Sequence, residues 1–470
     1  MKKTFASIIL AVLVLTINLS AYAQLHLPSI ESDNMVLQQN RSIQFRGWAG
    51  PIQKIQVVAS WNNDTLKTVT PSDAEWSVTL KTPKAGGTYH ITVIGDTTLV
   101  IHNVLIGEVW LCSGQSNMEF SPSWHPKYFK SVIEKAHHPE LRFFKVDKMS
   151  APYPQKLIQG KWQVCTPKSV RSFSAAGYFF GRELRKKLNE PVGLIESAWG
   201  GTPVEAWTPS EVFAQHTKLA VSAAKLTPVP WCPVRPSVTY NAMIHPLVKY
   251  PIAGVIWYQG EENTANPSTY EATFSDMIHS WRGLWHKQFP FYFVQIAPFA
   301  YGQPYSAALV REAQLKTWEH MPKTGMVVTT DITGDTTNIH PYDKIDVGRR
   351  LADWALTKTY GMKGISYSGP LYQSMTVKGN KTILHFKFAQ NGLMKKGRGP
   401  LKDFMIAGAD HHFVPAKAKI KGSTVVVYSS SVHHPVAVRF GFSNTAEPNL
   451  FNKAGLPASP FRTDHWKVGK

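Results

Sequence analysis

The 470-residue chain has few cysteines and no long hydrophobic run beyond its N-terminus. Its three cysteines, Cys112, Cys165 and Cys232, are odd in number and widely spaced, which excludes a disulfide-stabilised scaffold. No CxxC pair or His/Cys cluster indicates a metal site, so we expect neither structural zinc nor an essential disulfide. Cys112 is expected to be a small core residue. No later stretch reaches the roughly 18 apolar residues of a membrane span.

The N-terminal residues have the pattern of a secretory signal peptide. Lys2 and Lys3 precede an apolar run over residues 5–15, and residues 21–23 read AYA, an A-x-A cleavage site before Gln24. The run is too short and too early to anchor the protein in a membrane. We therefore predict that residues 1–23 are removed and that the mature protein is secreted or periplasmic.

Acidic residues are scarce relative to basic ones. The chain has 51 Lys and Arg against 31 Asp and Glu, a net charge of +20. This surplus is typical of a solvated basic surface, and it would also attract an acidic glycan or an anionic surface. Nucleic acid is not expected as a partner, because the chain is predicted to be exported and has no basic stretch with interleaved aromatics. The sequence carries no signal for an oligomeric state.

Changes in pattern divide the mature chain into three parts. Residues 24–104 contain short strand patterns separated by turn residues, which predict a β-sandwich. Over residues 105–362, strands alternate with helices, which predicts an α/β domain whose parallel sheet is covered on both faces. Strand patterns return over residues 363–470 and predict a C-terminal β domain.

The elements expected in the α/β domain can be given as residue ranges. The strands are expected at 108–112, 193–198, 253–258, 291–296 and 325–330, and the helices at 174–188, 268–284 and 343–358. In such a sheet the ligand crevice lies beyond the carboxyl ends of the strands.

The first of these strands leads directly into a candidate nucleophile. Residues 114–118 read GQSNM and follow the strand that ends at Cys112. At such a strand-to-helix turn Ser116 would be exposed, with backbone N–H groups beside it that can stabilise an oxyanion. The alternative is a serine that only caps the helix. Ser113 competes for the role but lies nearer the strand.

Two more strand ends carry polar and glycine residues. Residues 199–202 read WGGT, and paired glycines allow a backbone N–H to approach a ligand closely, although a plain turn would also contain them. Residues 257–263 read WYQGEEN, in which Gln259 and Asn263 can donate hydrogen bonds to an oxyanion. Glu261 can orient another polar group.

A candidate base lies in the loop before the last helix of this domain. His340 stands there, where it could reach Ser116 across the crevice. Serine needs such a base because its hydroxyl is a weak nucleophile at neutral pH. A lone histidine is more often structural, and a catalytic one needs a partner that fixes its tautomer.

Together these motifs resemble the sialate O-acetylesterase family of SGNH-type hydrolases, with a flavodoxin-like hydrolase domain. The resemblance covers nearly the whole mature chain and extends to DNMVLQ at 33–38, YNAMI at 240–244, REAQ at 311–314 and GLPASPFRTD at 455–464. It implies Ser116 as nucleophile and His340 as base. Gly201 and Asn263 match the glycine and asparagine that complete the family's oxyanion hole with the Ser116 N–H, and Gln259 is a further candidate. We also expect Gln115 and Glu261 among the residues around the oxyanion and the substrate.

The third member of a catalytic triad is left open. Many SGNH hydrolases have Asp three residues before the histidine, where this chain has Thr337, followed by Asn338. Asp335 is our first choice because it lies in the same loop as His340. The alternatives are Glu261, Asp331 and a dyad oriented by a backbone carbonyl.

The resemblance implies a serine esterase that removes O-acetyl groups from a sugar, most directly O-acetylated sialic acid. Such a reaction requires neither a metal ion nor an organic cofactor. The closest alternative is an acetylesterase that acts on plant polysaccharide such as acetylated xylan. An alternative of another class is a noncatalytic glycan-binding protein with two β modules around an inactive hydrolase core.

Overall fold

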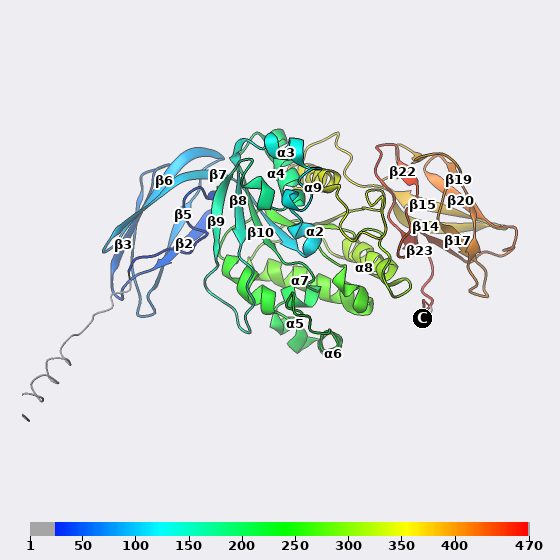
Figure 1. The fold of residues 1–470 in the computed structure, drawn as a ribbon, viewed down its shortest axis with the longest axis horizontal. Coiled ribbons are helices and arrows are strands. Elements are labelled where there is room, and N and C mark those ends of the chain that lie inside the picture. The colour runs from blue at the N-terminus through cyan, green and yellow to red at the C-terminus, as the bar shows by residue number, and fades with distance from the viewer. Residues whose placement is uncertain (1–23, 469–470) are drawn as a thin grey trace, which may run out of the picture.

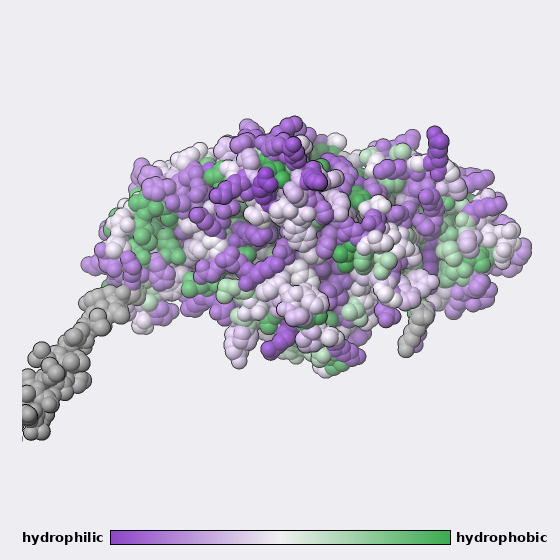
Figure 2. All heavy atoms as spheres, in the orientation of Figure 1, coloured by the Kyte–Doolittle hydropathy of each residue, from purple (hydrophilic) through white to green (hydrophobic). Residues whose placement is uncertain are grey.

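The computed structural model describes residues 24–468, so the predicted signal peptide lies outside the described residues. The molecule is elongated, with a β region at each end and helices and strands between them (Figure 1). Hydrophilic side chains cover most of the face seen in Figure 2, with apolar patches scattered among them. No helix in residues 24–468 is long and apolar enough to cross a membrane.

The N-terminal β region is built from strands with one buried face. In β5 the buried residues Trp76, Val78 and Leu80 alternate with more exposed ones, as expected for a strand with one face on a core. Strand β2 pairs with β5, and β3 pairs with β4 and β6. The strands are β1 (Val36–Gln38), β2 (Ser42–Trp48), β3 (Lys54–Ala59), β4 (Thr65–Val69), β5 (Glu75–Lys81) and β6 (Gly86–Ile94).

Strand β7 (Thr98–Gly114) joins this region to the central sheet. Its first half pairs with β6 and its second half with β10 and β11, so the predicted boundary at residues 104–105 falls inside one continuous strand. The central sheet has the order β13-β12-β11-β7-β10-β8-β9, and only β9 runs antiparallel to its neighbour. Its other strands are β8 (His138–Val146), β9 (Gly160–Cys165), β10 (Val192–Ala198), β11 (Gly254–Tyr258), β12 (Phe291–Val294) and β13 (Thr324–Val327).

Helices cover both faces of this sheet, which confirms the predicted α/β class. One apolar core joins the sheet to α4 (Ala175–Leu188) and α9 (Lys344–Lys358), and another joins it to α7 (Tyr270–Leu284) and α8 (Ser306–His320). The three helices predicted from the sequence correspond to α4, α7 and α9. Strands β10, β11 and β12 are buried along their whole length, because helices pack on both sides of them. The shorter helices are α2 (Ser116–Glu119), α3 (Lys130–Glu134), α5 (Ser210–Gln215) and α6 (Thr217–Ala223).

The C-terminal region is again made of strands. Strands β14, β15, β20 and β19 form one antiparallel sheet, β18, β17, β21 and β23 form another, and β16 pairs with β22. The strands are β14 (Leu371–Lys378), β15 (Lys381–Lys387), β16 (Leu393–Lys395), β17 (Phe404–Ala407), β18 (Val414–Pro415), β19 (Lys417–Lys421), β20 (Thr424–Tyr428), β21 (Ala437–Phe440), β22 (Leu450–Asn452) and β23 (Phe461–Arg462).

The three cysteines are free and buried. Cys112 lies in the core between the sheet and α4, as the sequence predicted.

Candidate active site

The three central strands of the sheet end side by side. β7 pairs with β10 on one side and with β11 on the other, and Gly114 lies opposite both Ala198 and Tyr258. The chain leaves β7 for the edge of the sheet, returns at β10 and continues on the opposite side at β11. Such a reversal in strand order opens a crevice beyond the carboxyl ends, where α/β proteins bind ligands.

Ser116 begins helix α2 at the end of β7. At the preceding turn Gly114 has φ +134°, and a Cβ atom there would lie 2.2 Å from the carbonyl oxygen of Tyr258, so only glycine fits. The turn leaves Ser116 partly exposed, whereas Ser113 is fully buried within the strand. Of the two serines considered from the sequence, Ser116 is the one that a substrate can reach.

The loop after β10 lies against the Ser116 backbone. A Cβ atom on Gly200 would lie 3.2 Å from the Ser116 Cβ, and the Gly200 N–H donates to Glu119 Oε2 over 2.8 Å. Gly201 has φ +80°. Within residues 24–468, neither the Ser116 N–H nor the Gly201 N–H donates a hydrogen bond. Two backbone donors are therefore free beside the serine.

Asn263, predicted for the oxyanion hole, has both amide hydrogens occupied. Its Nδ2 donates to Glu205 Oε2 over 2.8 Å and to Asn266 Oδ1 over 3.0 Å. Its Oδ1 accepts from the Val204 N–H over 2.9 Å. Burial raises the pKa of Glu205, and its bonds to the two asparagine amides oppose that shift.

The side-chain amide hydrogens of Gln259, the further oxyanion candidate, are also donated to protein acceptors. Its Nε2 donates to Asn263 Oδ1 over 2.7 Å and to the Thr202 carbonyl over 3.3 Å. The structure thus places both amides behind the loop that carries Gly201, where they hold that loop in position. The strand-end motif brought them to the crevice, but their partners Thr202, Val204 and Glu205 lie 57–59 residues away in sequence and could not be read from it.

Gln115 and Glu261 also bond to protein groups. Gln115 Oε1 accepts from the N–H groups of Gly260 and Glu262, both over 3.3 Å, so it joins the ends of β7 and β11. Glu261 is buried, and its Oε1 accepts from Asn117 Nδ2 over 2.6 Å.

Asn117 connects the nucleophile segment to the base segment. Its Nδ2 also donates to the Ile339 carbonyl over 3.0 Å, and its Oδ1 accepts from Lys344 Nζ over 2.7 Å. Because Asn117 follows Ser116 and Ile339 precedes His340, these bonds keep the two segments together.

Lys344 is the buried cation of this network. Its Nζ donates to the Pro341 carbonyl over 2.6 Å and lies 4.6 Å from the centre of the Phe120 ring. Burial lowers its pKa to about 7, and the charges of Glu261 and Asp343 oppose this shift. Burial raises the pKa of the Glu261 carboxyl. The buried Lys344 side chain therefore holds the loop between His340 and α9, and it is an ammonium group mainly below about pH 7.

His340 is half-buried at the edge of the crevice. The ring of Trp124 packs against it edge-on, with the ring centres 5.4 Å apart and an interplanar angle of 90°. Burial lowers the pKa of His340 to about 4, assisted by the charges of Lys344 and His125 and opposed by that of Glu119. The ring is therefore neutral at neutral pH, the form that can accept a proton.

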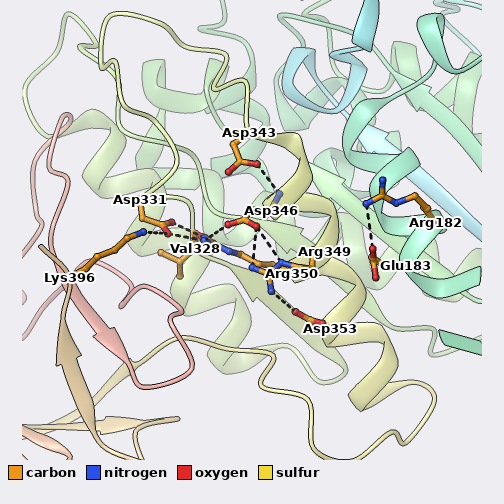
Figure 3. Close-up of polar contacts among 10 residues, drawn as sticks. All are labelled: Arg182, Glu183, Val328, Asp331, Asp343, Asp346, Arg349, Arg350, Asp353 and Lys396. Carbon is orange, nitrogen blue, oxygen red and sulfur yellow. Dashed lines mark hydrogen bonds and ion pairs between the residues drawn. The ribbon is translucent and has the colours of Figure 1, made fainter. Parts of the chain in front are cut away.

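No carboxylate within residues 24–468 hydrogen-bonds the His340 ring. Asp335, the first choice from the sequence, is exposed, and its Oδ1 accepts from the Thr337 N–H over 2.8 Å and from Thr337 Oγ1 over 2.6 Å. Asp331 forms two 2.8 Å hydrogen bonds with Arg350 (Figure 3). Both aspartates are thus used to shape the loop, and Glu261 bonds Asn117 as described above.

Glu119 and Lys344 were not singled out from the sequence. Glu119 lies three residues after Ser116 in α2, and this spacing places both side chains on one face of a helix. The spacing could therefore have indicated Glu119 as a site residue. Lys344 gave no such signal, since a lysine at a helix start is usually solvated. Within the described part of the chain, no group of three or more His, Cys, Asp or Glu side chains is placed to hold a metal ion.

Comparison with known proteins gives consistent matches. Residues 106–357 match a family model described as carbohydrate esterase, sialic acid-specific acetylesterase. The chain is 28% identical to human sialate O-acetylesterase over 96% of its length and 94% of the human protein. It is 30% identical to the enzyme of the same name from Pongo abelii, covering 82% of this chain and 80% of that one. A carbohydrate acetylesterase from Xanthomonas citri has the same fold, with a TM-score of 0.86 and 37% identity, over 94% of this chain and all of that one.

Proposed function

Since the chain belongs to the carbohydrate esterase family of sialic acid-specific acetylesterases, and is a carboxylic ester hydrolase, we propose that it deacetylates O-acetylated sialic acid through Ser116 and His340. The family and its relatives support hydrolysis of O-acetyl esters on sugars. The choice of sialic acid rests on the family description and on the net charge of +20, which suits a carboxylated sugar.

The proposed reaction has two steps and needs no cofactor. Ser116 Oγ attacks the acetyl carbonyl carbon while neutral His340 takes the serine proton, and the sugar oxygen then leaves with that proton. In the second step His340 takes a proton from water, the resulting hydroxide attacks the acetyl-serine, and acetate leaves as Ser116 recovers its proton. In both steps the Ser116 and Gly201 N–H groups stabilise the oxyanion.

Within this mechanism we give Asn263 and Gln259 a positioning role. Both hold the loop of Gly201 from behind, so the direction of the Gly201 N–H depends on them. Gln115 and Glu261 act similarly on the loops after β7 and β11.

We propose that His340 and Ser116 work as a dyad. Trp124 restricts the imidazole ring by packing, and the charge of Glu119 favours the imidazolium that forms in each step. Asp335 keeps the base loop in shape through Thr337.

The observation that carries the proposal is the pair of free backbone donors beside a partly exposed serine. The N–H groups of Ser116 and Gly201 have no protein acceptor within residues 24–468, while the neighbouring Gly200 N–H does. Unpaired donors at a strand-to-helix turn are what the oxyanion of acyl transfer requires. A serine that only capped a helix would not need the second donor.

The test compares the rates of acetate release from O-acetylated sialic acid and from acetylated xylo-oligosaccharides. We expect the wild-type enzyme to prefer the sialic acid and Ser116→Ala and His340→Ala to abolish release. A preference for the neutral xylo-oligosaccharides would favour the second candidate, a plant-polysaccharide acetylesterase; the Xanthomonas citri protein is described as a carbohydrate acetylesterase, a name that does not restrict the sugar to sialic acid. Binding without turnover would indicate the noncatalytic alternative.

We also propose that the enzyme is exported to the periplasm or beyond. The basis is the pattern of Lys2, Lys3, the apolar run and the AYA site described above. N-terminal sequencing of the protein purified from its source should give Gln24 as the first residue.

A further inference from the structure

Two tryptophans of the described chain expose a large part of their side chains, and both lie beside the active site. Trp124 is 41% exposed and Trp231 is 67% exposed. Aromatic surface left in water loses the stabilisation that burial would give, so exposed tryptophans that gather at a crevice indicate a ligand surface.

Trp124 belongs to an aromatic group on the histidine side of the crevice. It packs edge-on against His340. Nearby, the ring of Tyr342, 40% exposed, lies 3.9 Å from that of His125, and the ring of Tyr128, 49% exposed, lies 6.1 Å from that of Tyr342. Several partly exposed rings thus line this side.

Trp231 lies next to Gly201, one of the two proposed oxyanion donors. A Cβ atom on Gly201 would lie 3.1 Å from Trp231 Nε1, so the indole ring reaches the Gly201 backbone. The Trp199 indole N–H donates to the Trp231 carbonyl over 3.3 Å and fixes this segment. One exposed tryptophan therefore lies at the proposed base, and the other lies at a proposed oxyanion donor.

Beyond Trp231 the surface is hollowed. A cavity of about 310 Å³ lies there, and Cys232, one of its lining residues, also contacts the Gly201 position. Its other walls are mostly proline and valine, with Arg235 as the one charged lining residue. A cavity of this size and composition can hold one further sugar ring, with its C–H groups on the apolar wall.

We propose that the enzyme binds its acetylated sugar as part of an oligosaccharide, whose neighbouring rings stack on Trp124 and on Trp231. The C–H face of a pyranose carries slight positive charge and packs on the negative face of an indole ring. An isolated sugar at Ser116 would contact neither surface fully, whereas a chain of sugars contacts both. This inference rests on the proposed function and names the class of substrate, an oligosaccharide chain.

The test measures kcat/KM for three kinds of substrate in wild type, Trp231→Ala, Trp231→Phe and Trp124→Ala. The substrates are p-nitrophenyl acetate, a free O-acetylated monosaccharide and an O-acetylated oligosaccharide. Each of the two sugar substrates is used in two versions, one that contains sialic acid and one that is derived from xylan. We expect wild type to prefer the oligosaccharide, and each alanine variant to lower the ratio of kcat/KM on the oligosaccharide to kcat/KM on p-nitrophenyl acetate by about tenfold, as loss of one aromatic contact implies. Trp124→Ala should in addition lower kcat/KM on every substrate, because Trp124 also packs on His340. Trp231→Phe should retain most of the ratio, because it keeps an aromatic face.

Trp61→Ala is the matched control. Trp61 lies in the N-terminal β region, where it packs on Tyr89, and its replacement should leave the ratio unchanged. Equal wild-type efficiency on monosaccharide and oligosaccharide would overturn the inference while leaving the proposed function in place. A proportional fall on all substrates in both alanine variants would also overturn it, since that result indicates a structural role. Failure of the wild type to release acetate from any sugar would contradict the proposed function itself.

Discussion

At the scale of single residues, the nearby serines Ser113 and Ser116 lie in different environments. Ser113 is inside β7 and fully buried, and its hydroxyl has no partner within the described part of the chain, while Ser116 has left the sheet. We predict that Ser116→Ala lowers kcat by about 10⁴- to 10⁶-fold, the scale of a lost catalytic serine. Ser113→Ala should change kcat by less than about tenfold, because it removes only an unpaired hydroxyl. Steady-state kinetics with p-nitrophenyl acetate measures both, and circular dichroism checks the fold.

The environment of His340 predicts an unusual pH profile. Catalysis needs the neutral ring, and burial lowers the His340 pKa to about 4. The value of kcat/KM should therefore rise with pH through about 4 and be level between pH 6 and 7, not halved near the ordinary histidine pKa of about 6.5. The measurement is kcat/KM from pH 3.5 to 8 with a substrate that carries no ionisable group. A midpoint near 6.5 would contradict the solvent-shielded environment of the ring.

Two carboxylates near His340 can be distinguished by their effects. Glu119 acts on His340 through its charge and also accepts the Gly200 N–H, so Glu119→Gln should lower kcat at least about tenfold, equivalent to 1.4 kcal/mol of barrier. Asp335 is exposed and bonds only Thr337, so Asp335→Asn should have a smaller effect. The same kinetic assay ranks the two variants. A much larger loss in Asp335→Asn would restore it as the triad acid.

At the scale of elements, one buried network holds the loop between β13 and α9 against the end of β7. Lys344→Met removes the ammonium group that bonds Asn117 and the Pro341 carbonyl, and leaves the buried Glu261 without its cation. We expect a loss of about 1–3 kcal/mol in unfolding free energy, the range for leaving buried hydrogen-bond partners unsatisfied, together with a lower kcat. Urea unfolding and kinetics measure the two effects.

The matched control for that variant lies at the other end of the same helix. Lys358→Met replaces an exposed lysine of α9 and should leave kcat unchanged. Adding Glu261→Gln to Lys344→Met should cost less than the sum of the single losses, because the two charges compensate each other. Full additivity would show that the two groups do not act through one network.

Sequence patterns predicted the elements whose burial is regular. Helix α4 has a serine cap and one apolar face, β11 is apolar throughout and β10 begins with an apolar run, so each was found within about two residues. Helix α8 was missed because Arg311, Gln314 and Thr317 point into the interior and interrupt its apolar face. Gln314 Oε1, for example, accepts from the Ile296 N–H, a contact that exists only in the folded chain.

The site shows the same division between local and long-range information. The strand-end motifs located Ser116, Gly201 and the WYQGEEN loop, because turn chemistry and polar residues are local signals. The long-range partners of Asn263 were not predictable, since they depend on how loops from different strands meet, whereas the contact of Asp335 is local. Asn263 bonds Val204, 59 residues away, and Asp335 bonds Thr337 in its own loop, not His340.

At the scale of the whole molecule, both β regions are attached to the α/β domain by buried polar contacts. Tyr250 donates to the Val36 carbonyl over 2.7 Å on the N-terminal side. On the C-terminal side, Arg462 forms two 2.9 Å hydrogen bonds with Glu312 of α8. Together with the continuous strand β7, these contacts predict that the protein unfolds as one unit.

We therefore predict one calorimetric transition in the wild type, shifted to lower temperature in Arg462→Ala. Loss of the guanidinium group removes the bidentate partner of the largely buried Glu312, which keeps Lys316, at a cost of about 1.5–3 kcal/mol. KM should not change, since Arg462 makes no contact with the site residues described above. Two separate transitions in the wild type would show that the β regions unfold independently.

The most direct test of the central claim is to identify the residue that becomes covalently modified. A fluorophosphonate forms a bond from the attacking serine oxygen to phosphorus and releases fluoride, so it marks the nucleophile irreversibly. After complete inactivation, peptide mass spectrometry should find one adduct per chain, located by fragmentation on Ser116, and none in Ser116→Ala. An adduct on Ser113 or another serine, or inactivation with no adduct on Ser116, would contradict the account.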